Sequence, residues 1–437
     1  MILTAIFAPS CAKDKTILRY EFNNGTEAAL PYPGVSFAVI SDLHIYDPSL
    51  GSSGAAFEKA LSSDRKLLLE SIELLDYATD SIIASGAGFV CIAGDLTKDG
   101  EVVNHRLMAE KLKRFTDAGI KVYVVPGNHD IKNPGAVSYK GDETEYIAVI
   151  NAEEFKIIYR DYGYGAAIMR DGDSVSYVAE PAPGLWLLAL DACRYRENVS
   201  GYSMYPGAEA IVSGKISQKT ADWIAGVLKA AKDQNKAVMV MMHHGMVEHW
   251  KGQAKLHPDY LVSDYANFGK FLASWDVRLA FSGHYHAQDI ARGDFGGKEL
   301  YDIETGSLIT APCPMRFVEI NNNIAQIRTD TIVEKLRPGT DFAASAHAFV
   351  KKTVMLETVS ILKKYKVSEK DMEYIAGAAG DAFAAHYSGD EDPGLRPPFD
   401  KKKLSLWGRF IYSQFKYAMD GLWNDIFPAD NNVRIEL

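Results

Sequence analysis

Three short apolar runs in the first third of the chain each lead directly into a cluster of polar residues. Their β-branched and aromatic residues predict buried strands at residues 35–40, 89–93 and 122–125. Between these runs, apolar residues recur at the three- and four-residue spacing of amphipathic helices. Alternating strands and helices are typical of an α/β domain, in which ligands bind at the carboxyl ends of the strands. We therefore expect the polar clusters to meet at one edge of the sheet.

The alternation resumes after a long segment at residues 131–172, which is rich in Gly, Tyr and Asp. We interpret this segment as an excursion over the functional face. Further strands are predicted at residues 176–179, 185–190, 237–242 and 277–282, and antiparallel strands near Leu300, Phe317 and Ile324. Beyond about Leu336 the pattern predicts only helices. The expected organisation is an N-terminal segment at 1–34, an α/β domain at 35–335 and a helical accessory region at 336–437.

Net charge limits the partners of this chain. Its 437 residues include 47 Lys and Arg against 57 Asp and Glu, a formal net charge of -10. Because the chain has no basic cluster long enough to follow a phosphate backbone, we expect no nucleic-acid polymer as a partner. An acidic protein can still bind a phosphate-bearing small molecule if metal ions supply positive charge locally. The oligomeric state does not follow from composition.

The four cysteines indicate neither a disulfide framework nor a thiolate zinc site, because they are widely spaced and form no Cys-x-x-Cys pair. Cys11 differs from the others because it follows an apolar stretch that ends in small residues. This stretch resembles the end of a bacterial lipoprotein signal, which implies a lipid on Cys11 and a location at the cell envelope. A plain apolar N-terminal arm, with a cytoplasmic location, is the alternative. Membrane association is expected only through such a lipid.

The polar residues at the predicted strand ends are carboxylates, an amide and imidazoles. They are Asp42, His44, Asp95, Asn128, His129, His243, His284 and His286. This mixture of hard oxygen and imidazole donors suits a pair of divalent first-row metal ions, whereas calcium prefers oxygen alone. The Asp-x-His and His-x-His pairs each place two donors on the same side of an extended chain. The single carboxylate of Asp95 can bridge two ions with its two oxygens.

Taken in order, these motifs resemble those of the calcineurin-like binuclear metallophosphoesterases. The motifs are Asp-x-His, Gly-Asp-x-x-x-x-Gly at 94–100, Gly-Asn-His-Asp at 127–130, a strand that ends in His, and Gly-His-x-His. The resemblance implies a four-layer αββα sandwich of two mixed sheets, here with an all-helical C-terminal extension. It also implies a phosphoric ester hydrolase that uses two metal ions, Mn, Fe or Zn. Lys98 stands where the purple acid phosphatases have a metal-binding tyrosine, so we expect no ferric-tyrosinate centre.

The resemblance assigns roles to individual residues. It implies one ion held by Asp42, His44, Asp95 and His286, and a second ion held by Asp95, Asn128, His243 and His284. A metal-bound hydroxide would attack phosphorus, while His129 contacts the phosphate and protonates the leaving group. Asp130 is expected either to orient the His129 ring or to cap a helix.

Three further residues are candidates for substrate contact: His244, Arg194 and Tyr46. Arg194 could bind an acidic group with two hydrogen bonds, and a solvent-exposed loop position is its alternative. The expected substrate is a small phosphoester, either a monoester or a diester, and the motifs are closer to the phosphodiesterase branch than to the nucleotidases. The alternative function is a catalytically silent protein on the cell envelope that binds metal or a phosphate ligand.

Overall fold

The computed structural model describes residues 18–25, 29–62, 64–198 and 210–437. Cys11 and its expected lipid attachment lie outside these residues. Within them, no helix is both long enough and apolar enough to cross a membrane. The cysteines in this part of the chain, Cys91, Cys193 and Cys313, are free thiols.

The first of two large sheets contains the strands that were predicted at the start of the chain. In spatial order its strands are β15 (Asn432–Glu436), β14 (Ile324–Thr331), β13 (Pro314–Asn321), β1 (Val35–Ile40), β2 (Phe89–Ile92) and β3 (Lys121–Val124). β1, β2 and β3 are parallel, and β13, β14 and β15 are joined to them by antiparallel pairing. Asn322 and Asn323 adopt positive φ in the tight β13–β14 turn, as the Asn-rich hairpin predicts.

The second sheet is also mixed. In spatial order its strands are β11 (Asp289–Asp294), β12 (Glu299–Glu304), β10 (Leu279–Ser282), β9 (Ala237–Met242), β8 (Leu185–Leu190), β7 (Tyr177–Ala182) and β6 (Met169–Arg170). The four strands β12, β10, β9 and β8 are parallel, and antiparallel strands flank them. β8 and β9 are buried throughout, which explains their uninterrupted apolar sequences.

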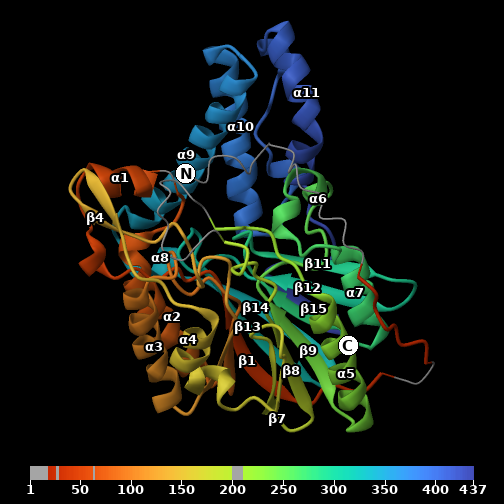
Figure 1. Cartoon of the computed structure of the whole chain (residues 1–437). Helices are drawn as coiled ribbons and strands as arrows, with labels where there is room; N and C mark the ends of the chain where they lie inside the picture. The colour runs from red at the N-terminus through yellow and green to blue at the C-terminus, as the bar shows by residue number, and fades with distance from the viewer. Residues whose placement is uncertain (1–17, 26–28, 63, 199–209) are drawn as a thin grey trace.

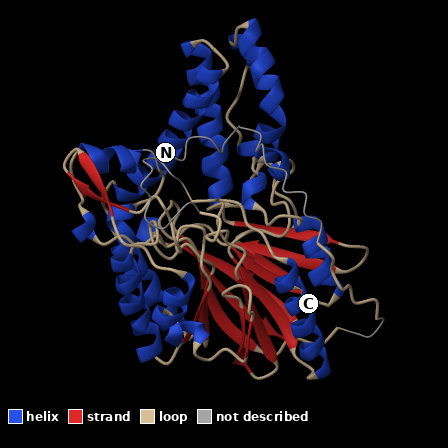
Figure 2. Cartoon of the chain, in the orientation of Figure 1, coloured by secondary structure: helices blue, strands red, loops and turns tan. Residues whose placement is uncertain are grey.

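Helices surround the two sheets, and some of them cover the outer face of each sheet (Figures 1 and 2). Those before the second sheet are α1 (Ala55–Ser62), α2 (Ser71–Ser85), α3 (Val102–Asp117) and α4 (Ala152–Ile158). Those that follow are α5 (Gln218–Asp233), α6 (Gln253–Leu256), α7 (Tyr265–Ser274) and α8 (Val333–Leu336). Local sequence starts several of them: the Ser217 side chain caps α5, and Asn151 with Glu154 forms a capping box on α4.

The two sheets pack face to face through aromatic residues. The Phe37 ring stacks on Phe89 in its own sheet with centroids 4.6 Å apart, and it meets the edge of Phe281 from the second sheet at 5.4 Å. Apolar residues on the other face of the second sheet, such as Leu188 and Val240, pack against α5 and α7. This order of layers is the predicted αββα sandwich, so the fold class is confirmed.

The C-terminal region projects beyond the sandwich as three long helices (Figure 1). They are α9 (Phe342–Lys364), α10 (Glu369–Ser388) and α11 (Leu406–Gly421). The expectation of helices alone is wrong at the very end, where β15 returns to the first sheet and pairs with β14. The five residues of β15 alternate in character, with Ile435 buried, but the run is too short for its pattern to stand out beside the helices.

The long segment at 131–172 consists mainly of loops and a hairpin, with little helix. It holds β4 (Val137–Lys140) and β5 (Glu143–Tyr146), which pair with each other, then α4 and a π-helical turn at Arg160–Tyr164. His105 of α3 lies beneath this segment, with Nδ1 2.8 Å from the Tyr159 hydroxyl and Nε2 2.8 Å from the carbonyl oxygen of Asp130. His105 therefore connects the excursion to the sandwich.

His105 makes stability depend on pH. Burial lowers its pKa from 6.5 to about 3, so the folded chain holds it neutral while the unfolded chain protonates it below about pH 6.5. The unfolded state thus binds more protons between these pH values, and this group makes unfolding easier by about 1.4 kcal/mol per pH unit of acidification. We expect His105→Gln to flatten the pH dependence of urea unfolding between pH 6.5 and 4.5. A slope equal to that of the wild type would contradict the prediction.

Candidate metal centre

The predicted ligands stand on turns that follow the parallel strands of both sheets. Hydrogen bonds between these turns hold them together: the Asp42 amide donates to the Gly94 carbonyl at 3.1 Å, and the Gly283 amide donates to the His243 carbonyl at 3.1 Å. Positive φ angles recur in these turns, at Asp42, His44, Asp95, His284 and His286. Such left-handed backbone is costly for residues other than glycine and tends to occur at functional sites.

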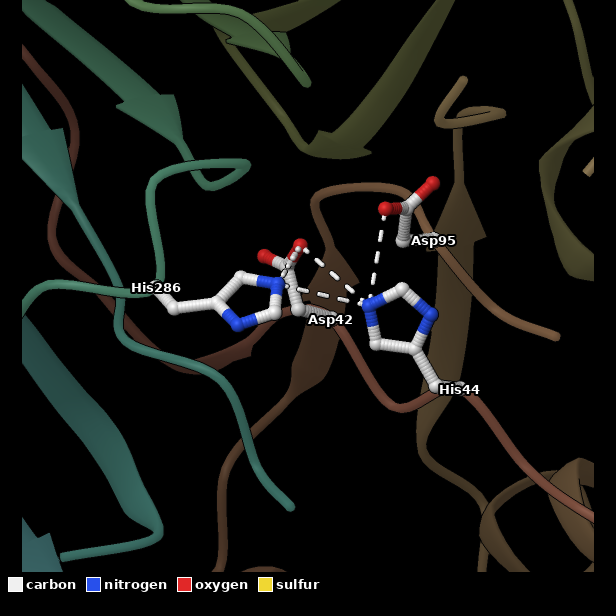
Figure 3. A group of neighbouring side chains, drawn as sticks. All are labelled: Asp42, His44, Asp95 and His286. Atoms are coloured by element: carbon white, nitrogen blue, oxygen red, sulfur yellow. Dashed lines mark hydrogen bonds and ion pairs between the residues drawn. The ribbon is translucent and has the colours of Figure 1, made fainter. Parts of the chain in front are cut away.

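Four of the predicted ligands form one compact group, Asp42, His44, Asp95 and His286 (Figure 3). The Nε2 atoms of His44 and His286 lie 3.3 Å apart, and His44 Nε2 is 3.5 Å from Asp95 Oδ2. Asp42 Oδ1 is buried without a hydrogen-bond partner, although His286 Nε2 lies 3.2 Å away. Converging imidazole nitrogens beside an unsatisfied carboxylate oxygen fit a divalent cation.

A second group, Asp95, His243 and His284, shares Asp95 with the first. His243 Nε2 lies 3.4 Å from Asp95 Oδ2 and 3.3 Å from Asn128 Oδ1. Asn128, the predicted amide ligand, therefore lies beside this second group. His243 Nδ1 lies 2.8 Å from the Ala93 carbonyl and can donate to it, which leaves the lone pair of Nε2 facing the group. The structure therefore brings all seven predicted ligands together around Asp95.

Two motif glycines allow this close packing. A Cβ atom on Gly127 would lie 2.0 Å from Asp95 Oδ1, and one on Gly94 would lie 2.5 Å from His243 Nδ1. Gly94 also has a φ of +95°, which residues with a side chain rarely adopt. Both glycines are therefore required by the space that the ligands occupy.

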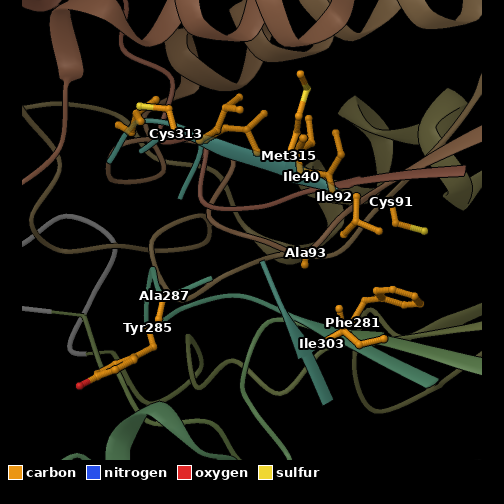
Figure 4. Close-up of a cluster of buried hydrophobic side chains, with 14 of the residues drawn as sticks. Ile40, Cys91, Ile92, Ala93, Phe281, Tyr285, Ala287, Ile303, Cys313 and Met315 are labelled. Carbon is orange, nitrogen blue, oxygen red and sulfur yellow. The ribbon is translucent and has the colours of Figure 1, made fainter. Parts of the chain in front are cut away.

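A packed core supports the ligand turns from below (Figure 4). Ile40 and Ile92 come from the ends of β1 and β2, and Phe281 and Ile303 come from the second sheet. All four are fully buried. Because side chains in such a core occupy fixed rotamers, the turns above it are held in place before any ligand binds.

The charge of this cluster favours cations. Burial alone would lower the pKa of His243, but the carboxylates of Asp95 and Asp42 raise it to about 9. The buried carboxylates thus draw positive charge to the site. Divalent ions would supply that charge without a proton on the imidazole.

His129 lies at the open side of the cluster, with 15% of its side chain exposed. Its Nε2 is 3.9 Å from Asp95 Oδ2, and its Nδ1 is 2.8 Å from Asp99 Oδ1. The expectation that Asp130 orients this ring is corrected: Asp130 is fully buried and accepts hydrogen bonds from the backbone amides of Leu96, Thr97 and Gly127. Asp130 thus fastens two ligand turns together, and Asp99 is the partner of His129.

Asp99 was missed because a single carboxylate in the Gly-Asp-x-x-x-x-Gly loop carries no distinctive pattern. Its Oδ2 contacts the ammonium of Lys98, which fixes the carboxylate between a cation and an imidazole. Burial opposes ionisation, but Lys98 and His129 together hold the pKa of Asp99 below its usual range. Lys98 itself faces Asp99 and Glu101.

We expect Asp99→Asn to lower kcat by about 10- to 100-fold without loss of metal, because an amide can present its NH₂ group to His129 Nδ1 and turn the ring away. The measurement is kcat together with metal content. Asp47→Asn, on the loop that precedes a short 3₁₀ helix, is the matched control. An unchanged kcat in Asp99→Asn would show that His129 needs no partner.

The three substrate candidates have different surroundings. Tyr46 is corrected to a core residue: it is 1% exposed, its hydroxyl donates to the Gly51 carbonyl, and its ring stacks on Phe57. The guanidinium of Arg194 is bound to Glu197, with Nε 2.9 Å from Oε1, and to the Ser213 hydroxyl. The directions of the Tyr46 and Arg194 side chains depend on local turns, which the spacing of residues in the sequence does not specify.

His244 lies beside the second metal group. Its ring centroid is 4.4 Å from that of His284, and its Nε2 is 2.9 Å from the Val212 carbonyl. Burial, with the nearby His243, lowers the pKa of His244 to about 3, and its Nδ1 is buried without a partner. A neutral His244 thus packs behind His284.

Sequence reasoning also missed Lys66. This residue is 4% exposed, and its Nζ lies 3.2 Å from Asp64 Oδ2. Burial is the main cause of the lowered pKa of His44, and the Lys66 charge is the next. A cation therefore stands close to the metal cluster, where a phosphate would bear negative charge.

A two-sheet sandwich with two overlapping Asp and His groups at its strand ends defines a metal-dependent phosphoesterase. The chain belongs to the calcineurin-like phosphoesterase family, whose model matches residues 35–288. The predicted family and the predicted class, a phosphoric ester hydrolase, are thereby confirmed.

Several solved structures are similar in fold. They include a dimetal phosphatase from Danio rerio (16% identity, 69% of this chain and 97% of that chain, TM-score 0.47). Another is the sulfate thiohydrolase SoxB from Thermus thermophilus (13% identity, 75% of this chain and 61% of that chain, TM-score 0.37). A third is the purple acid phosphatase PPD1 from yellow lupin (11% identity, 69% of this chain and 53% of that chain, TM-score 0.40). No curated protein matches the sequence.

Proposed function

We propose that this chain hydrolyses a small phosphoester at a dinuclear metal centre. One ion would be held by Asp42, His44, Asp95 and His286, and the other by Asp95, Asn128, His243 and His284. The observation that carries the proposal is the shared position of Asp95, whose Oδ2 lies about equally far from His44 Nε2 and His243 Nε2, at 3.5 and 3.4 Å. A carboxylate in this place can bridge two ions.

When bound, the two ions neutralise phosphate charge and activate water at neutral pH. The protein residues supply the remaining steps. Asp99 holds the His129 ring through Nδ1 and leaves Nε2 on the side of the cluster. Burial would lower the pKa of His129, but Asp95 and Asp99 raise it above its ordinary value. This raised pKa favours the protonated form of His129, whose Nε2 would donate a proton to the leaving oxygen.

The substrate is proposed to be small because the surroundings of the cluster are crowded. The Tyr260 ring lies 4.7 Å from His284, and Arg65 next to Lys66 pairs with Glu357 of α9 at 3.5 Å. Helix α9 thus borders the site through this ion pair. Lys66 is the proposed contact for a phosphate oxygen.

The test combines metal analysis with hydrolysis of p-nitrophenyl phosphate and bis(p-nitrophenyl) phosphate. We expect about two metal ions at the centre and turnover of at least one ester, which chelation abolishes and added Mn²⁺ or Zn²⁺ restores. A metal-loaded chain that cleaves neither ester would favour the other candidate, a silent metal or phosphate-binding protein. The intact set of ligands with His129 and Asp99 in place supports the enzyme.

A further inference from the structure

A second cluster of buried imidazole and carboxylate groups lies where the C-terminal helices meet the second sheet. Asp289 begins β11, His386 lies in the last turn of α10, and Glu391 follows that helix. Their ligand atoms lie within 4.8 Å of one another, and all three residues are buried. None of them belongs to the dinuclear centre.

The geometry of this cluster leaves polar atoms unsatisfied. His386 Nδ1 is 3.7 Å from Asp289 Oδ2 and contacts Glu391 Oε1. The other atoms, His386 Nε2 and Glu391 Oε2, are buried and have no hydrogen-bond partner. The side chains are only 1% and 2% exposed, so water cannot freely satisfy these atoms. His386 Nε2 is on the other side of the ring from these contacts, but Glu391 Oε2 has lone pairs that a cation beside Asp289 and His386 Nδ1 would accept.

Charge in the surrounding network points to a cation. Buried carboxylates near the cluster are Asp289, Asp302, Glu304, Glu391 and Asp430. The buried basic groups are His249, His386 and Arg316, and Arg316 donates its closest hydrogen bonds to backbone carbonyls. His249 Nδ1 is 2.7 Å from Asp289 Oδ1, while its Nε2 faces Asp302 and Glu304 at 3.5 and 3.7 Å. Acidic groups therefore outnumber basic ones.

We propose that Asp289, His386 and Glu391 bind a further divalent transition-metal ion, separate from the dinuclear centre. One imidazole and two carboxylates suit Zn²⁺ or Mn²⁺. Asp425, just after α11, has a buried Oδ1 without a partner. Burial, and then the charges of Asp289 and Glu391, raise the pKa of Asp425 to about 7, so it also lies near this negative charge. The ion would fasten α10 and the segment after α11 to β11.

The test measures bound Zn²⁺ by plasma mass spectrometry in full-length chains that carry Asp95→Asn, which disables the dinuclear centre. We expect one Zn²⁺ fewer when Glu391→Gln is added, and Zn²⁺ should no longer raise the unfolding temperature. Glu334→Gln is the matched control, because Glu334 pairs with the exposed His347 at 3.0 Å in the same region. Equal Zn²⁺ content in all variants would overturn the proposal.

Anomalous diffraction from Zn²⁺-soaked crystals of the wild type provides a second readout that needs no variant. We expect a peak among Asp289, His386 and Glu391. Peaks at the dinuclear centre without a peak here would overturn the proposal.

A different observation concerns the far end of the helical region. Leu406, Trp407 and Phe410 at the start of α11 are 83%, 49% and 54% exposed. Trp407 and Phe410 stack with centroids 5.3 Å apart, and Trp407 Nε1 donates to the Tyr365 carbonyl, which joins this patch to the end of α9. The free ends of these helices project away from the sheets in Figure 1.

Basic residues surround this apolar patch. They are Lys363, Lys364, Lys366, Lys370, Lys401, Lys402, Lys403 and Arg409, all exposed. The same two segments, 363–370 and 400–410, contain only two acidic residues, Glu369 and Asp400, so they carry a net charge of +6 in a chain with -10 overall. Basic residues beside exposed Trp, Phe and Leu match an anionic lipid interface, where the rings enter the headgroup layer.

We infer that this tip, residues 363–370 and 400–410, docks on an anionic membrane surface. The test is co-sedimentation of the full-length chain, with Cys11→Ser to remove any lipid, with vesicles of phosphatidylcholine alone or with 30% phosphatidylglycerol. We expect binding only to the anionic vesicles, and a loss of about 10-fold or more in Trp407→Ser/Phe410→Ser because two inserted rings are removed. Phe427→Ser, which removes a 65% exposed ring elsewhere, is the matched control.

Equal binding to neutral and anionic vesicles, or binding that the double variant retains, would overturn this inference. Basic and aromatic residues also bind single-stranded nucleic acid. A fluorescently labelled oligonucleotide is therefore included, and binding to it without binding to vesicles would overturn the membrane assignment.

Discussion

Replacing Asp95 with Asn is expected to remove the dinuclear centre and lower kcat/KM by about 10³-fold or more, the scale of losing a group that organises transition-state charge. The physical reason is its position: Oδ2 faces His44 and His243, and Oδ1 accepts the His129 amide at 2.9 Å. Asparagine has one oxygen and no negative charge, so it cannot bridge two cations. Metal content and kcat/KM, measured on the same preparation, check the prediction.

Asp191→Asn is the control for Asp95→Asn. Asp191 is also a buried carboxylate directly after a strand, β8, but it accepts hydrogen bonds from the Cys193 amide and the Tyr195 hydroxyl. This variant should keep its metal and most of its activity. Full activity with full metal content in Asp95→Asn would mean that the bridge is not needed, and the proposed function would then be wrong in its central feature.

Replacing His129 with Gln is expected to lower kcat by about 10² to 10⁴ for an alkyl phosphoester, the usual contribution of a general acid. For a p-nitrophenyl ester the loss should stay within about 10-fold, because nitrophenolate leaves without receiving a proton. Metal content should not change, because His129 Nδ1 is engaged by Asp99 and only Nε2 faces the cluster. Steady-state kinetics on both esters check the prediction.

The dependence on the leaving group separates proton donation from a purely structural role. If His129 only supported the ligand turns, both esters would lose activity equally and metal would be lost with them. Asp99→Asn should also lose more activity on the alkyl ester than on the p-nitrophenyl ester, but by a smaller factor, because Asp99 acts through the ring of His129. Equal losses on the two esters in His129→Gln would refute the general-acid role.

The candidate metal ligands could be named from the sequence because each of them lies shortly after the end of a strand. In a parallel sheet the strand ends meet at one edge, which places Asp42, Asp95 and Asn128 together. That the histidines of the second sheet join them was implied by the resemblance to the family. The strands themselves were predictable because β8 and β9 are buried on both faces and therefore apolar throughout. The structure places Asp42, Asp95 and His243 in the two groups of candidate ligands.

Residues near these motifs were less predictable. Asp130 is adjacent to His129 in the sequence and Asp99 lies 30 positions earlier, yet only Asp99 faces its ring. Tyr46 comes two residues after His44 but turns into the core. His44 and Asp95 have positive φ, and a left-handed residue redirects the chain in a way that side-chain alternation does not anticipate.

The sequence by itself predicted an α/β domain from its residue periodicity and the types of candidate ligand from their donor chemistry, and the order of its motifs, through the resemblance to the family, implied the αββα class. Only the tertiary structure decided which carboxylate holds His129, and that Asp289, His386 and Glu391 meet. His386 lies 97 positions after Asp289, and no motif links them. The physical reason is that such contacts depend on how elements distant in the sequence pack against one another. The position of α10 beside β11 and the turns between strands together bring these residues into contact.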